Sequence, residues 1–163
     1  MKPGRITEAI AVGVMSPLRK LFLEWVMALR HLRDTASIRS KLLTLIFSIT
    51  PADRAAVLID NILLSRERDG AAPAVAVDRE VMDRVLKDGS PILTHERGRP
   101  RLCIPLDAFD SRVGVIYAEA SDSGEPLDNT HLHLLTGVAA VAALAFEHAS
   151  FIEQLQAQNS RLK

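Results

Sequence analysis

The last third of the chain contains an unbroken stripe of positions spaced alternately four and three residues apart. Its mostly apolar members are Leu134, Val138, Val141, Ala145, His148, Ile152, Leu155, Asn159 and Leu162. This is the a/d spacing of a helix that packs along a straight seam against another helix. We expect residues before 151 to lie on the chain's own domain, and 151–163 to form an extension that pairs with a second chain. Because the pattern is still in register near Lys163, we also expect an output domain downstream in the full-length protein.

A second stripe with the same spacing lies near the amino terminus. Its members are Leu18, Phe22, Trp25, Leu29 and Leu32. Ser16 and Pro17 precede it in the order of an N-cap and a first helical residue. The pattern predicts a flexible tail or linker over 1–16 and a helix that begins near residue 17.

The middle of the chain alternates between helical and strand patterns. Apolar positions at helical spacing predict helices over 35–49 and 77–88, and Gly89 follows the second as a left-handed C-cap. Short apolar runs predict strands at 55–59, 62–66, 90–94, 101–106 and 112–118. The last two runs are almost continuously apolar, as in central strands covered on both faces. Pro105 cannot donate to a neighbouring strand, which places its end of the strand at an edge or a bulge.

The order of these elements predicts one domain of the α+β class over 17–150. It would have three α/β/α layers, a mainly antiparallel sheet with flanking helices, and long helices at both ends. Asp128 or Asn129 is expected to cap the final helix.

Composition excludes several classes of function. Lys and Arg total 20 and Asp and Glu total 20, so the net charge is zero. Binding to nucleic acid or to an anionic membrane favours a basic excess, and neither is expected as a direct partner. The single cysteine, Cys103, allows no disulfide within the chain and fits a reducing cytoplasm. The sequence contains no run of eighteen apolar residues, so no membrane span is predicted.

The sequence predicts no catalytic residue and no metal site, and it leaves any cofactor unknown. It contains no G-x-S-x-G segment of a nucleophile elbow. His131 and His133 are two apart on a predicted helix, so they point in different directions and cannot share a metal ion. His95 has no second histidine at ligand spacing.

Two residues of the predicted central strands are candidates for a ligand pocket. Cys103 lies between apolar neighbours, and it is either a small buried core residue with a raised thiol pKa or a pocket or redox-sensing residue. Tyr117 is the only tyrosine. Its hydroxyl, if buried, needs a partner, which is either a group of the chain itself or a ligand.

Two polar residues interrupt the C-terminal stripe. His148 could loosen a dimer when it is protonated, or its ring could lie at the edge of the seam. Asn159 occupies an a-type position, where a paired asparagine specifies a parallel two-stranded register, although near a helix end it could simply be solvated. Together with Phe22, Trp25, Leu29, Ile152, Leu155 and Leu162, these residues are the predicted dimer interface.

Several segments, in this order, resemble a GAF domain. They are "LTLIFSITPADRAAVLI", "VMDRVLKDGSPILT", "LCIPL", "RVGVIYAEA" and "LHLLTGVAAVAALAFEHASFIEQL". The resemblance covers about residues 18–160. It implies a sensory or regulatory module that dimerises through its first and last helices, the last helix leading to an output domain. The segments "TPADRAAVLI" and "LLTGVAAVAALAFEHA" are most similar to GAF domains of bacterial regulators. Those regulators include activators that act with the sigma-54 form of RNA polymerase.

The chain also departs from parts of this family. The Asn-Lys-Phe-Asp-Glu set of cyclic-nucleotide-binding GAF domains is not recognisable, and Cys103 does not match a bilin-attachment position. Two functions therefore stay open at this point. The chain is either a regulatory sensor that relays small-molecule or neighbouring-domain signals as a parallel homodimer, or a purely structural dimerisation module without a ligand.

Overall fold

The computed structural model describes residue 20 and residues 23–24, 27–29, 34–70, 77–95, 99–109, 111–121 and 124–162. The predicted tail over 1–16, the start of the first helix, and the seam positions Phe22 and Trp25 lie outside the described residues.

The first helix described in full is α2 (Thr35–Ile49), and both of its ends are capped by side chains. At its start, the Asp34 carboxylate accepts hydrogen bonds from the hydroxyl and backbone N–H of Ser37, which lower the pKa of Asp34. At its end, the Arg68 guanidinium donates to the carbonyls of Phe47 and Thr50 at 3.0 and 2.7 Å. This cation therefore satisfies carbonyl groups at the negative end of the helix dipole.

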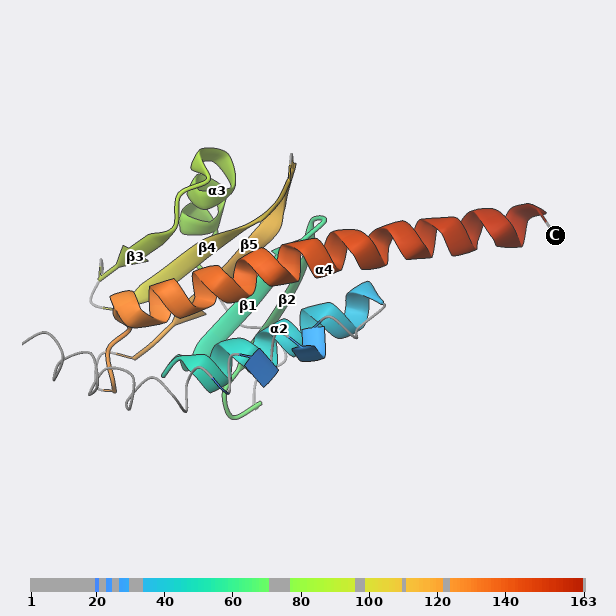
Figure 1. The fold of residues 1–163 in the computed structure, drawn as a ribbon. Helices are drawn as coiled ribbons and strands as arrows, with labels where there is room; N and C mark the ends of the chain where they lie inside the picture. Colours follow the sequence, from blue (N-terminus) through green and yellow to red (C-terminus); the bar gives the residue numbers. More distant parts are fainter. Residues whose placement is uncertain are drawn as a thin grey trace, which may run out of the picture.

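Five strands form one antiparallel sheet in the order β2-β1-β5-β4-β3. Their bounds are β1 (Arg54–Ile59), β2 (Ile62–Glu67), β3 (Ile92–Thr94), β4 (Arg101–Ala108) and β5 (Ser111–Glu119). The two near-continuous apolar runs became β4 and β5, with β5 in the centre, as predicted. Figure 1 shows α2 and α4 (Asn129–Leu162) on one face of this sheet and α3 (Arg79–Asp88) on the other. The predicted α+β fold with three layers is confirmed.

Local sequence explains the turn between β1 and β2 and the irregularity in β4. Asp60 and Asn61 both have positive φ, 53° and 63°, as the two-residue turn between β1 and β2 requires. Pro105 lies opposite Val115 of β5 but beyond the end of β3, and a register shift follows between Leu106 and Asp107. Because no strand of the described residues pairs with Pro105 on its other side, its missing N–H leaves no gap in the ladder, as expected for an edge position.

The two faces of the sheet bury different apolar clusters. The larger cluster lies under α2 and α4. Among its residues of α4 are Ala139, Ala142, Ala143 and Phe146, each at most 2 % exposed. The resemblance to a GAF domain implies this second, sheet-covering side of the helix. The smaller cluster lies under α3, which is capped by Asp78 at its start and by Gly89, with φ 75°, at its end.

The last part of α4 projects beyond the sheet (Figure 1), and every residue over 153–161 is exposed. Among the described residues, α4 is also long and apolar enough, by length and composition alone, to be a candidate membrane span. Its alanine-rich side is buried against the sheet, and helices in the cores of folded domains can have the same length and apolar composition.

Candidate functional site

A row of alternating charges crosses one end of the sheet. The pairing of neighbouring strands places Arg54 of β1 opposite both Glu67 of β2 and Glu119 of β5, and Glu119 opposite Arg101 of β4. Opposite residues in adjacent strands share a face. Tyr117 lies two positions before Glu119 on β5, so the two side chains are on the same face of the sheet. Tyr117 packs in the cluster under α3. The charged row therefore lies on the α3 face, next to the start of that helix.

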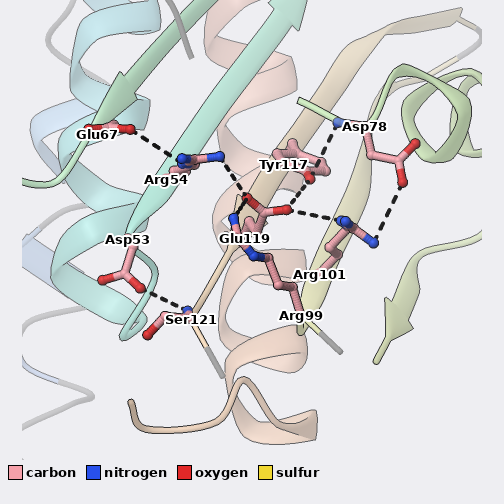
Figure 2. A network of polar contacts seen from close by, with 9 residues as sticks. All are labelled: Asp53, Arg54, Glu67, Asp78, Arg99, Arg101, Tyr117, Glu119 and Ser121. Carbon is pink, nitrogen blue, oxygen red and sulfur yellow. Dashed lines mark hydrogen bonds and ion pairs between the residues drawn. The ribbon is translucent and has the colours of Figure 1, made fainter. Parts of the chain in front are cut away.

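Glu119 is the centre of the row. Its side chain is only 7 % exposed, and three guanidinium groups approach its carboxylate. Arg101 Nε is 3.0 Å from Oε1, while Arg54 and Arg99 are 3.5 and 3.8 Å from Oε2. The Tyr117 hydroxyl donates to Oε1 at 3.3 Å. Figure 2 shows the side chains of Arg54, Arg99, Arg101 and Tyr117 gathered around the carboxylate of Glu119. A carboxylate this deeply buried is stable only when such partners replace its hydration.

The same network connects the sheet to the first turn of α3. Arg101 is also 3.7 Å from Oδ2 of Asp78, whose Oδ1 accepts the N-capping hydrogen bond from the Val81 N–H. The backbone N–H of Asp78 donates to the Tyr117 hydroxyl at 3.4 Å. Burial alone would lower the pKa of the Arg101 guanidinium, but the contacts with Glu119 and Tyr117 outweigh it and raise that pKa. Arg101 therefore stays charged and holds the sheet and α3 together.

The structure brings the two predicted pocket residues together. Cys103 and Tyr117 are directly opposite on β4 and β5, and both are fully buried under α3 with Met82 and Val85. Burial raises the pKa of Cys103 to about 12, and burial followed by the charge of Glu119 raises that of Tyr117 to about 12. The tyrosine hydroxyl has its partners within the chain. A ligand at these two residues stays a prediction.

Two cavities border the charged row, and they share Arg54, Arg99 and Glu119. One, of about 390 Å³, extends toward β2 and is lined also by Asp53, Glu67, Arg68, Asp69, Ala120 and Ser121. The other, of about 420 Å³, lies at the start of α3 and is lined also by Val77, Asp78, Arg79 and Arg101.

Sequence reasoning missed these charged residues. The available signal was a charge at one terminal position of four of the five strands, namely Arg54 of β1, Glu67 of β2, Arg101 of β4 and Glu119 of β5.

The predicted dimer interface is only partly available at the surface. Leu29 is 0 % exposed and belongs to the chain's own core, so its place in an interface between chains was wrong. His148, Leu155 and Asn159 are exposed, and Ile152 is half-buried. The side chain of Leu162, like Phe22 and Trp25, lies outside the described residues.

The heptad stripe predicted from the sequence omits two exposed apolar residues of α4. Leu144 is 44 % and Phe151 58 % exposed. With His148 and Leu155 they repeat at intervals of four, three and four, so the exposed stripe includes Phe151 rather than Ile152 at that level.

In the part of the chain that the structure describes, no group of side chains is arranged for catalysis or for metal binding. Over those residues, no three His, Cys, Asp or Glu side chains are grouped as metal ligands. The Asp128 carboxylate and the His131 ring are used locally, at the start of α4, where Asp128 accepts from the Thr130 N–H at 2.9 Å.

An antiparallel sheet covered by two helices on one face and by one helix on the other defines an α+β domain of three layers. The family model of the GAF domain matches residues 34–148, and the chain belongs to this family. No curated protein matches it.

Solved structures of GAF domains share the fold. The second GAF domain of DevS from Mycobacterium smegmatis is 26 % identical with a TM-score of 0.62, over 75 % of this chain and 99 % of that one. The GAF domain of the Acinetobacter phosphoenolpyruvate-protein phosphotransferase is 12 % identical with a TM-score of 0.66, over 83 % and 95 %. The GAF domain of the potassium sensor histidine kinase KdpD from Escherichia coli is 18 % identical with a TM-score of 0.57, over 83 % and 96 %. GAF domains of such bacterial sensors and regulators are signalling modules.

Proposed function

We propose that the chain is a regulatory, non-catalytic sensory and dimerisation module of a bacterial signal-transduction or transcription regulator, of which sigma-54-dependent activators are one kind. It works in the cytoplasm as a parallel homodimer. It relays small-molecule or neighbouring-domain signals through α4 to an output domain. The observation that supports this most directly is the exposed apolar stripe on α4.

The stripe fits a helix that pairs with its own copy. Leu144, Phe151 and Leu155 are 44, 58 and 45 % exposed, and His148 completes the spacing between the first two. An aromatic and two leucines on one side of a helix are a costly surface to leave in water. Pairing with the same stripe of a second copy along a two-fold axis would bury all of them at once.

A parallel arrangement suits the direction of α4. The helix packs on the sheet through its first half, and its exposed turns over 154–161 project away from the domain (Figure 1). In a parallel pair, the projecting turns of the two chains would lie side by side. Each helix advances by about 1.5 Å per residue, and the two helices could act together on the output domains that they connect to. Asn159, exposed in this segment, is available to pair with its counterpart and fix the register.

Oligomeric state tests the proposal. A doubly charged variant, Phe151→Asp with Leu155→Asp, should run as a monomer in multi-angle light scattering, while the unaltered chain runs as a dimer. Ala157→Asp is the control, because it places a negative charge on the exposed opposite side of the same turns. An unaltered chain that is monomeric at high micromolar concentration, or an Ala157→Asp variant that dissociates equally, would contradict the proposal.

One observation favours the alternative of a structural dimerisation module without a ligand. Cys103 and Tyr117 are fully buried under α3, so the interior of this face is filled by the chain itself. A thermal-shift screen of metabolites separates the two functions. A ligand at 100 times its dissociation constant stabilises the folded state by roughly 2.7 kcal/mol. A dimer that responds to no metabolite would be the structural module.

A further inference from the structure

We propose that the cavity of about 420 Å³ at the start of α3 binds a small metabolite through an oxyanion, either a carboxylate or a phosphate group. This inference rests on the proposed sensory function and specifies its ligand. It places that ligand at the end of the sheet, beside the charged row, rather than in the filled interior around Cys103 and Tyr117.

The lining of this cavity has an excess of positive charge. Four guanidinium groups, those of Arg54, Arg79, Arg99 and Arg101, face two carboxylates, those of Asp78 and Glu119, which gives a formal charge of +2. Glu67 pairs with Arg54 at 3.3 Å from the side of β2, and counting it still leaves +1. A volume of this size lies within the range of about 300–1,000 Å³ that small-molecule sites occupy.

Two of the four arginines are available to a ligand. Arg79 is exposed, and its side chain makes no ion pair or hydrogen bond with the residues that the structure describes. Arg99 is half-exposed, and its ion pair is the long 3.8 Å contact with Glu119. Arg54 and Arg101, by contrast, are held by closer contacts on both sides, with 3.3 and 3.0 Å as their shortest. Arg54 and Arg101 would supply a fixed positive potential, and Arg79 and Arg99 would contact the ligand directly.

Arginine is well suited to this chemistry, because its planar fork matches the two oxygens of a carboxylate or a phosphate. The first turn of α3 adds the positive end of a ten-residue helix to the same rim. The Glu119 carboxylate gathers three guanidinium groups at this rim. A bound oxyanion would compete with it for Arg99, and the change would reach α3 through the contact between Arg101 and Asp78.

Isothermal titration calorimetry on the full chain tests this site with two probes, inorganic phosphate and succinate, at constant ionic strength. The double variant Arg79→Gln with Arg99→Gln should bind the effective probe at least about tenfold more weakly than the unaltered chain, since two charged donors are lost. Arg84→Gln is the matched control, because Arg84 is an exposed arginine of the same helix that does not line the cavity. It should bind as the unaltered chain does.

Binding of succinate alone identifies a carboxylate ligand, and binding of phosphate alone a phosphorylated one. No heat with either probe, or equal affinity in all three proteins, would overturn the inference. Light scattering on the same samples separates this failure from that of the proposed function. A dimer that binds neither probe rejects only the oxyanion site, whereas a monomer rejects the dimeric relay whether or not a probe binds.

Discussion

Thr35 and Glu153 are 118 residues apart in the sequence, and they join the first turn of α2 to α4. The carboxylate of Glu153 accepts the backbone N–H of Thr35 at 2.9 Å and its hydroxyl at 3.2 Å. The contact satisfies a free N–H at the positive end of α2 with a negative charge, which is the favourable sign for a helix dipole. It lies where α4 leaves the sheet, so α2 and the projecting turns are fixed to one another at that point.

Removing this carboxylate should loosen the start of α2 more than it weakens the whole domain. Because the contact is exposed, Glu153→Ala should lower the free energy of unfolding by no more than about 1 kcal/mol. Hydrogen–deuterium exchange should show faster exchange over the first turn of α2, with unchanged protection in the sheet. Glu147→Ala, at another exposed acid of α4, should change neither. Equal exchange in the two variants would show that Glu153 does not hold α2.

The fold was largely predictable from the sequence because its elements are specified locally. The apolar runs of β4 and β5, the C-cap Gly89 of α3, and the heptad spacing along α4 each depend on residues close in the chain. That the first half of α4, with Ala139 and Phe146, covers the sheet was implied by the resemblance to a GAF domain.

The charged row was not predictable, because it depends on register. Arg54 and Glu119 are far apart in the chain, and only the pairing of β1 with β5 places them opposite one another. The prediction that Leu29 lies in an interface between chains failed for a similar reason. A heptad stripe shows which side of a helix is apolar, but not whether that side meets its own domain or a second chain.

Gly114 is required by close packing of strands. A Cβ at this position would lie 1.9 Å from the carbonyl oxygen of Leu58 on the adjacent β1, so the backbone of one strand would have to move. Gly114→Ala should destabilise the domain by about 2–3 kcal/mol, as overpacking in a core does. Urea denaturation followed by circular dichroism measures the loss. Gly124→Ala is the control, because its Cβ would meet only the Ser121 hydroxyl at 3.3 Å, and an equal loss in both would contradict the packing argument.

Glu119 should be the acidic residue on which stability depends most. Glu119→Gln keeps the shape of the side chain but removes the charge that three guanidinium groups share. The remaining positive charges would repel one another in a partly buried site, at a cost of about 3–5 kcal/mol. Chemical denaturation should show this loss, and Glu125→Gln, at an exposed acid, should change stability by less than about 0.5 kcal/mol. A Glu119→Gln variant as stable as the unaltered chain would show that the arginines do not depend on this carboxylate.

Alkaline pH should weaken the fold through Cys103 and Tyr117. Burial raises the pKa of the Cys103 thiol from 9.0 to about 12, and burial and Glu119 raise that of Tyr117 from 10.0 to about 12. Below the unfolded values both groups are protonated in both states, and their contribution is fully present. As pH rises above about 9, the unfolded chain loses these protons while the folded chain keeps them, so stability falls until the folded values are passed.

The measurement is the free energy of unfolding by urea at several pH values from about 8 to about 10.5. The unaltered chain should lose stability steadily above about 9, and Cys103→Ala, although less stable at pH 8 from the small cavity it leaves, should show a shallower slope. The thiol should also resist a disulfide exchange reagent in the folded chain and react on unfolding, since the thiolate is the reactive form. Parallel slopes for the two proteins, together with rapid modification of the folded thiol, would mean that Cys103 is accessible and that its burial does not control its ionisation.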